Sequence, residues 1–209
     1  MMLRRKLISI VFVLSLAAVL KAQSYSSRDS VFFLKNYTSK TEIGVDYLVP
    51  TRFSNKIKTI NFNCLFWKKY CKNISTLISV GITGTYAWGR SLQTYPLGDT
   101  AIEYVSYKTS AFGLGPVVQV DPTLVKIKRF SIIAEASGGV MLYNNHFPHG
   151  GDMYNFMFRT GPSVTYQLSK HAVLKAGYRW MHVSNGQGYG NQNPFYEAQG
   201  FSISFIKTM

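Results

Sequence analysis

The chain has 209 residues, with 23 lysine and arginine residues against nine aspartate and glutamate residues, and a formal net charge of +14. This length suits one domain of ordinary size, and the content of large apolar residues excludes a disordered chain. Nine carboxylates are too few for a carboxylate-rich calcium-binding protein, so the position of each acidic residue in the fold becomes informative.

The first 22 residues have the organisation of a signal peptide. Arg4, Arg5 and Lys6 precede an apolar run over residues 7–20 that only two serines interrupt. This run is short for a membrane-spanning helix, which needs roughly 20 residues, and it fits the apolar part of a signal peptide. We therefore expect residues 1–22 to be a cleaved signal peptide, and residues 23–209 to form a single domain. Its removal takes away four positive charges and no negative ones.

Eight segments of the remaining chain alternate between apolar and polar residues with a period of two, which is typical of β-strands with two different faces. They lie near residues 40–49, 57–67, 75–88, 102–118, 129–143, 153–168, 172–184 and 196–206. In the third segment one face carries Ile78, Val80, Ile82, Tyr86 and Trp88, and the other carries small polar residues. No apolar run beyond residue 22 is long enough to cross a bilayer as a helix, so the pattern predicts an all-β protein.

The predicted connections alternate in length. Compact ones are expected at residues 68–73, 119–128 and 169–171, and wider polar loops at residues 50–56, 89–101, 144–152 and 185–195. An even number of long strands, unequal loops and an export signal are typical of outer-membrane barrels. Closure of the sheet leaves no free edge in lipid. The sequence therefore predicts an eight-stranded antiparallel transmembrane β-barrel of the outer-membrane type.

A soluble eight-stranded barrel, such as a lipocalin, would alternate in the same way with its faces reversed. Aromatic residues near the predicted strand ends favour the membrane barrel, because such residues form interfacial girdles; they are Tyr86, Trp88, Tyr154, Tyr166, Tyr178 and Trp180. The opposite, polar face carries Glu42, Asp46, Glu135, Arg159, Lys175 and Arg179. We expect these charges to pair inside a lumen that is too narrow for a channel.

The last predicted hairpin places polar residues where apolar ones belong. By the period of two, His182 and Ser184 share the face of Tyr178 and Trp180, and Glu197 shares the apolar face of the next strand. Polar groups on the lipid face of a barrel are destabilising in a depth-dependent way. A carboxylate among apolar residues therefore needs a partner, and His182 is the nearest candidate.

One register keeps both apolar faces of this hairpin together. It sets His182 opposite Glu197, Tyr178 opposite Phe201, Ala176 opposite Ile203 and Leu174 opposite Phe205. Directly opposed residues of an antiparallel pair share a face and have close Cβ atoms. The register would bring an imidazole beside a carboxylate and two residues from a serine, the set of a base, an orienting acid and a nucleophile. The alternative is that the three polar groups merely lie at the membrane–water interface.

The same residues carry a family resemblance. His182-Val-Ser184-Asn185, followed by Asn193-Pro194 and then Glu197, resembles the lipid A 3-O-deacylase (PagL) family of outer-membrane barrels. The resemblance implies Ser184 as nucleophile, His182 as base and Glu197 as the residue that orients His182. It implies weaker roles in loop support or at the oxyanion for Asn185, Asn193 and Gly186. The chain departs from the family at Phe195, where glycine is frequent, and at its last residue, which is not aromatic.

The predicted function is that of an outer-membrane serine esterase that removes an ester-linked acyl chain from lipid A of lipopolysaccharide, with no cofactor and no metal. The alternative is a non-catalytic outer-membrane barrel with a structural or adhesive role. A structural or adhesive barrel would leave His182 and Ser184 incidental. The sequence does not decide which acyl chain is cut or whether the barrel forms a homodimer.

Three further signals have simpler readings. His146 and His149, with Asp152, could suggest a metal site, but two loop histidines are more often solvated. Cys64 and Cys71 are expected to form a short-loop disulfide or to remain two inert thiols. The basic excess lacks the helical stripe of a nucleic-acid-binding protein, so we expect cationic loops that face a phosphorylated glycolipid.

Overall fold

The computed structural model describes residues 40–51, 55–71, 76–97, 101–186 and 194–208. The predicted signal peptide and Asn193 lie outside these ranges. Within them, the structure has no helix of the length and apolarity that a bilayer crossing requires.

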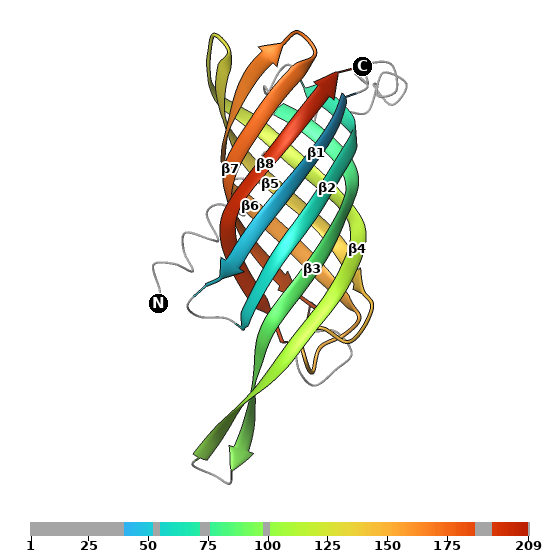
Figure 1. Ribbon diagram of the computed structural model, residues 1–209, viewed down its shortest axis with the longest axis vertical. Coiled ribbons are helices and arrows are strands. Elements are labelled where there is room, and N and C mark those ends of the chain that lie inside the picture. The colour runs from blue at the N-terminus through green and yellow to red at the C-terminus, as the bar shows by residue number, and fades with distance from the viewer. Residues whose placement is uncertain (1–39, 52–54, 72–75, 98–100, 187–193, 209) are drawn as a thin grey trace, which may run out of the picture. The chain divides into compact units, whose positions relative to one another are not determined.

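The described chain is a closed barrel of eight antiparallel strands, each paired with its neighbours in chain order and the last paired with the first (Figure 1). The strands are β1 (Lys40–Pro50), β2 (Lys56–Cys71), β3 (Thr76–Leu97), β4 (Ala101–Ile127), β5 (Phe130–Tyr143), β6 (Tyr154–Ser169), β7 (Ala172–Ser184) and β8 (Tyr196–Thr208). The predicted strand number, antiparallel order and closure are confirmed.

Three predicted connections are wrong in their bounds. The wide loop expected at residues 89–101 is largely strand, because β3 and β4 continue as a paired hairpin as far as Leu97 and Ala101. Likewise, residues 119–127 of the connection expected at residues 119–128 are the end of β4. The connection expected at residues 68–73 begins only after β2 ends at Cys71. Alternation marks a strand only where its two faces meet different surroundings. Where a strand continues past the apolar part of the outer surface, both of its faces can carry polar residues. The alternation then disappears, although the strands remain paired.

The apolar faces point outward and the polar faces inward. Large apolar side chains on the outer surface include Ile43, Phe62, Phe112, Leu114, Leu142, Phe156, Phe201 and Ile203. The inner face carries buried polar side chains, such as Asn61, Thr83, Gln119 and Ser137, together with a cluster of buried apolar ones that includes Leu48, Ile57, Met141 and Met181. This orientation is opposite to that of a soluble barrel with an apolar interior, so the reversed alternative is excluded. The core is polar at the centre of the barrel.

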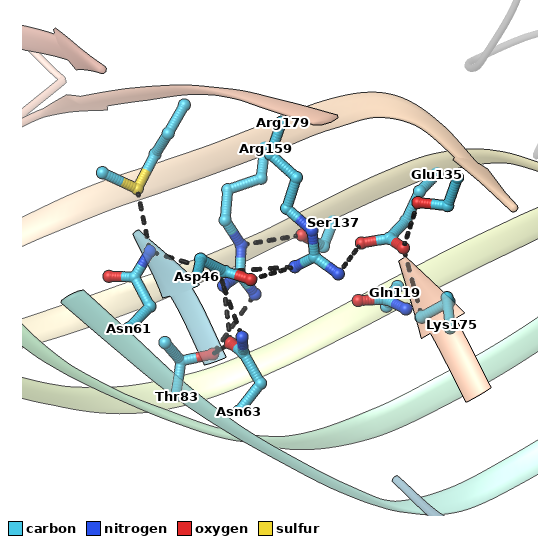
Figure 2. Close-up of polar contacts among 12 residues, drawn as sticks. Asp46, Asn61, Asn63, Thr83, Gln119, Glu135, Ser137, Arg159, Lys175 and Arg179 are labelled. Atoms are coloured by element: carbon cyan, nitrogen blue, oxygen red, sulfur yellow. Dashed lines mark hydrogen bonds and ion pairs between the residues drawn. The ribbon is translucent and has the colours of Figure 1, made fainter. Parts of the chain in front are cut away.

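The interior charges form one network (Figure 2). Asp46 accepts from Arg159 Nη1 at 3.0 Å and lies 3.3 Å from Arg179 Nη1, and Asn61 and Asn63 also donate to it. Lys175 pairs with Glu42, with Glu135 at 3.1 Å and with Asp121 at 3.5 Å, and Arg179 pairs with Glu135. The predicted pairing of the six inward charges is confirmed, and Asp121 joins them. The side chains fill the lumen.

Candidate active site

The centre of the site is the pair His182 on β7 and Glu197 on β8, which face each other directly in the strand register. His182 Nδ1 lies 3.4 Å from Glu197 Oε1. Their side chains are 34% and 25% exposed, so both are half-buried on the outer face of the barrel. The predicted register is confirmed, including Tyr178 opposite Phe201 and Ala176 opposite Ile203.

Ser184 is the last residue of β7 and lies two positions after His182, on the same outer face. It is half-buried and faces Phe156 of β6 in the register. Within the described ranges, the structure gives a direct contact between His182 and Glu197 but no hydrogen bond between Ser184 and His182. Side chains at i and i+2 of a strand stand about 6.5–7 Å apart at their Cα atoms. At this spacing a rotation of the serine and imidazole side chains suffices to bring them together.

Glu197 is also held from the other side by Thr51, which follows β1. The Thr51 backbone N–H donates to the carbonyl oxygen of Glu197 at 3.0 Å. The Thr51 hydroxyl lies 3.4 Å from Glu197 Oε2. The carboxylate therefore has one oxygen toward the imidazole and the other toward Thr51, and this arrangement fixes its orientation.

The imidazole of His182 has an aromatic ring on each side along the strands. Trp180 precedes it by two residues on β7, with ring centroids 6.0 Å apart and planes inclined by 27°. Phe195 precedes Glu197 by two residues at the start of β8, with its ring 5.5 Å from His182 and inclined by 26°. Since the strands are antiparallel, the two rings lie on either side of the His182–Glu197 pair. Both rings therefore contact the imidazole and limit its movement along the strands.

Asn185 and Gly186 follow Ser184 at the barrel rim. The side chain of Asn185 is buried, and its Nδ2 donates to Asp152 Oδ2 of the β5–β6 loop at 2.8 Å. Gly186 has φ 69°, in the left-handed region that favours glycine, and an added Cβ would lie 3.0 Å from the Phe156 ring. The asparagine amide thus ties the end of β7 to a loop, and the glycine lets the chain turn away beside Phe156.

The β5–β6 loop is itself anchored in the barrel mouth. Phe147 is fully buried and packs against Tyr143 and Tyr196, whose hydroxyl groups are 2.8 Å apart. Asn155 donates to the carbonyl oxygens of Phe147 and Asp152 at 2.9 and 3.2 Å. Asp152 therefore presents its carboxylate to Asn185 from a loop that the barrel holds in place.

The two loop histidines are engaged separately. His146 Nδ1 lies 3.0 Å from the carbonyl oxygen of Gly151, and the ring of His149 stacks on Tyr107 at 4.1 Å. In the part of the chain that the structure describes, no three histidine, cysteine, aspartate or glutamate side chains gather as a metal site would require. Cys64 is a free, exposed thiol.

Three residues at the site have no signal in the sequence pattern. Thr51 and Asn55 lie in a predicted loop, and Asp152 looked like part of a histidine-rich loop. Asn55 donates to the carbonyl oxygen of Phe195 at 2.7 Å and accepts from the Leu92 N–H at 2.7 Å, so it ties the start of β8 to β3. The β1–β8 pairing, extended by one residue, brings Thr51 opposite Glu197. The sequence pattern did not predict how β1 pairs with β8, so it gave no sign of this contact.

The chain is similar to one protein family and to solved outer-membrane proteins. The profile of the family described as lipid A 3-O-deacylase (PagL) matches residues 66–205, more than half of the chain. The crystal structure of the outer membrane enzyme PagL superposes with a TM-score of 0.49 at 13% identity, over 80% of this chain and 99% of that one. The solid-state NMR structure of the outer membrane protein AlkL gives a TM-score of 0.32 at 10% identity, over 83% of this chain and 89% of that one. No curated protein sequence matches the chain.

The matched region runs from the end of β2 to β8 and contains His182, Ser184 and Glu197. The chain belongs to the lipid A 3-O-deacylase (PagL) family.

Proposed function

We propose that this protein is a serine esterase of the bacterial outer membrane that removes an ester-linked acyl chain from lipid A of lipopolysaccharide. Ser184 is the nucleophile, His182 the general base and Glu197 the residue that orients and stabilises the imidazole. The observation that carries the proposal is the direct opposition of His182 and Glu197 on the outer face of the barrel, with Ser184 two residues further on that face.

The apolar outer surface supports a membrane location. Water would make such a surface costly, at roughly 25 cal/mol per Å² of apolar area, whereas lipid chains accept it. The interior carries the charges and is filled, so the barrel is not a pore. An active site on the outer face receives its substrate from the bilayer: the acyl chain stays among lipid chains while its ester lies beside Ser184.

The division of labour on the imidazole follows from its contact with Glu197. With Nδ1–H donated to the carboxylate, Nε2 is the basic nitrogen. This nitrogen takes the Ser184 proton as the hydroxyl oxygen attacks the ester carbonyl carbon, and Glu197 stabilises the imidazolium that forms. Collapse of the tetrahedral intermediate breaks the ester bond, and the proton passes to the departing sugar oxygen.

An acyl-serine remains after the first half of the reaction. Water, deprotonated by His182, attacks the acyl carbon, and the fatty acid leaves as the proton returns to Ser184. Base assistance of this kind contributes roughly 10²–10⁴-fold. The backbone N–H groups of Asn185 and Gly186, next to Ser184, are the candidate donors to the oxyanion, which is the largest contribution in many such enzymes.

Lipid A from bacteria that express the protein tests the proposal. Mass spectrometry should find a species that lacks one acyl chain, and Ser184→Ala should abolish it at equal amounts of folded barrel in the membrane. Ser106→Ala, which changes an exposed serine on the outer face of β4, should retain it. Since the family is described as lipid A 3-O-deacylase, the ester at the 3-O position of lipid A is the first whose loss should be examined. Unchanged lipid A with abundant folded protein would leave the structural barrel as the better account.

A further inference from the structure

A row of cations continues the line of the catalytic pair around the barrel. Lys56 of β2 is directly opposed to Arg90 of β3, and Arg90 is directly opposed to Lys108 of β4. All three are exposed on the outer face. The β1–β2 register pairs Leu48 with Thr59, and its continuation by three residues sets Thr51 beside Lys56. From Thr51 the row leads to Glu197, whose carbonyl oxygen accepts the Thr51 N–H, and then to His182. One line perpendicular to the strands thus joins the proposed catalytic residues to three positive charges.

β3 lies unusually close to β2 at Gly89, next to Arg90. Gly89, next to Arg90, has φ 153°, and an added Cβ would lie 1.9 Å from the carbonyl oxygen of Lys56. Only glycine lets β3 approach β2 so closely here. Asn55 also ties Leu92 of β3 to the start of β8. The cations and the proposed catalytic pair are therefore connected through neighbouring strands and the Asn55 hydrogen bonds.

A hollow on the outer surface lies at the same place. Its volume is about 430 Å³, and it is lined by Trp88, Gly89, Arg90, Lys108, Thr109 and Ser110. Arg90 and Lys108 are cationic, and Ser110 on the same outer face carries a hydroxyl group. Together these three side chains suit an anion with several oxygen atoms. The hollow is open, as a site for part of a large membrane ligand would need to be.

The aromatic residues below the hollow indicate its depth. The rings of Tyr86 and Trp88 stack at 5.2 Å, and those of Tyr86 and Phe112 at 4.6 Å, on the outer face of β3 and β4. Aromatic belts of this kind mark the interface between lipid chains and head groups. Arg90 and Lys108 follow this belt in the direction of the β3–β4 hairpin, so they stand at the level of the head groups.

The position relative to the ester follows from barrel geometry. Neighbouring strands are about 4.8 Å apart, so three spacings separate Glu197 on β8 from Arg90 on β3 by roughly 14 Å along the row. With strands tilted by about 35–45°, this is roughly 10 Å around the barrel and roughly 10 Å toward the end where the β3–β4 hairpin projects (Figure 1). A sugar phosphate likewise lies farther out than the acyl esters of the same glycolipid.

The carboxylates of the site do not oppose an anion there. Among the carboxylates whose side chains the structure describes, Glu42, Asp46, Asp121 and Glu135 are buried in the lumen, and Glu197 alone lies on the outer face of a strand. The outer face of β2, β3 and β4 near Arg90 therefore presents a positive field.

We propose that Arg90, Lys108 and Lys56, with the hollow beside Trp88, bind a phosphate group of the same glycolipid molecule whose acyl ester lies at Ser184. This inference rests on the proposed function and adds to it a determinant of substrate choice. The cations position the sugar and favour phosphorylated over dephosphorylated lipid A. Each cation near a membrane surface contributes roughly a fivefold gain in affinity for an anionic head group.

Two purified substrates in mixed detergent micelles test the site: bisphosphorylated lipid A and the same lipid after phosphatase treatment. The readout is the ratio of kcat/KM for the two. The wild-type full-length chain should prefer the phosphorylated lipid by roughly tenfold or more, and Arg90→Gln with Lys108→Gln should remove most of that preference. Lys126→Gln with Arg129→Gln removes two exposed cations at the other end of β4 and should keep the wild-type ratio. Arg90→Lys with Lys108→Arg should keep it as well.

An unchanged ratio in the Arg90→Gln, Lys108→Gln protein would overturn the phosphate site, as would an equal loss in the control pair. Dissociation constants for the two lipids, measured with Ser184→Ala protein, separate this inference from the esterase proposal. If wild type cleaves neither lipid, the esterase proposal fails. The phosphate site then stands or falls on whether the Arg90 and Lys108 substitutions remove a phosphate-dependent difference in affinity.

Discussion

The ring of Phe195 lies 5.5 Å from the imidazole of His182, with the two planes inclined by 26°. Trp180 flanks the imidazole from the side of the preceding residues of β7. Because the rings limit the rotation of His182, they help to hold Nδ1 toward Glu197 and to leave Nε2 for the nucleophile.

Phe195→Leu should lower kcat by roughly three- to tenfold, since an aromatic contact contributes about 0.5–1.5 kcal/mol beyond its buried area. The leucine keeps an apolar side chain but removes the π face that stabilises the imidazolium. Steady-state release of fatty acid from micellar lipid A measures the effect. Phe201→Leu, on the exposed outer face of the same strand, should leave kcat within about twofold. Equal effects of the two substitutions would refute a specific role for the ring at His182.

Glu197→Gln should lower kcat by roughly 10²–10⁴-fold, because the neutral amide no longer stabilises the imidazolium and permits the wrong tautomer of His182. Glu197→Asp keeps the charge at a greater distance from His182, and its kcat should lie between those of wild type and Glu197→Gln. Single-turnover acylation with excess enzyme isolates the chemical step. A kcat for Glu197→Gln within threefold of wild type would mean that Glu197 is not the orienting acid.

Thr51→Val should lower kcat by a few-fold, because it removes the hydroxyl at 3.4 Å from Glu197 Oε2 and keeps the shape of the side chain. A typical hydrogen bond to a charged group contributes about 1.5–3 kcal/mol, and this one is long. In a double-mutant cycle with Glu197→Gln the two effects should not add, since Thr51 acts through the carboxylate. Additive effects would show that Thr51 does not act through the Glu197 carboxylate and contributes only to the stability of the barrel.

The register of the hairpin β7–β8, which carries the proposed catalytic residues, could be predicted because apolar residues surround the polar ones on both strands. A shift of one residue would have turned the apolar side chains of one of the two strands into the lumen, so the pattern excluded it. The same reasoning placed Arg159 and Lys175 inside, where the structure has them paired. Period-two alternation is informative wherever lipid and lumen demand opposite side chains.

The alternation gave no information on the parts of the strands that extend past the apolar outer surface. The extensions of β3 to Leu97 and of β4 to Ile127 are held by backbone hydrogen bonds, which carry no sequence signal. Thr51 and Asn55 lie 146 and 140 residues away from the residues they contact in β8 and its start. Such contacts depend on closure of the barrel between β1 and β8, and no local pattern in a single sequence indicates them.

Asp46→Asn should destabilise the barrel by roughly 3–5 kcal/mol, the usual cost of removing one partner from a buried ion pair. Asp46 is fully buried and interacts with both Arg159 and Arg179 (Figure 2), so its neutralisation leaves two guanidinium groups short of a counter-charge. Urea unfolding in detergent, followed by tryptophan fluorescence, gives the free energy of unfolding. Lys207→Gln, an exposed charge on β8, should change it by less than about 0.5 kcal/mol. A loss below 1 kcal/mol for Asp46→Asn would show that the network is not needed for stability.

Asp152→Ala should lower kcat several-fold with little change in KM, because Asp152 holds the Asn185 amide at 2.8 Å and Asn185 directly follows Ser184, the proposed nucleophile. Without this contact the end of β7 loses its tie to the β5–β6 loop, and the backbone N–H groups next to Ser184 lose their fixed direction. The loop itself should remain in place, since Phe147 and Asn155 anchor it through contacts that do not use the Asp152 side chain.

Asp152→Asn is the informative companion, because its side-chain oxygen can still accept the Asn185 N–H while the charge is removed. A positioning role predicts that asparagine restores most of the kcat that alanine loses. If both substitutions were equally harmful, the negative charge and not the hydrogen bond would be what the site requires. If neither changed kcat, the tie between Asn185 and Asp152 would have no part in holding Ser184, and the end of β7 would be fixed by its pairing with β6 and β8 alone.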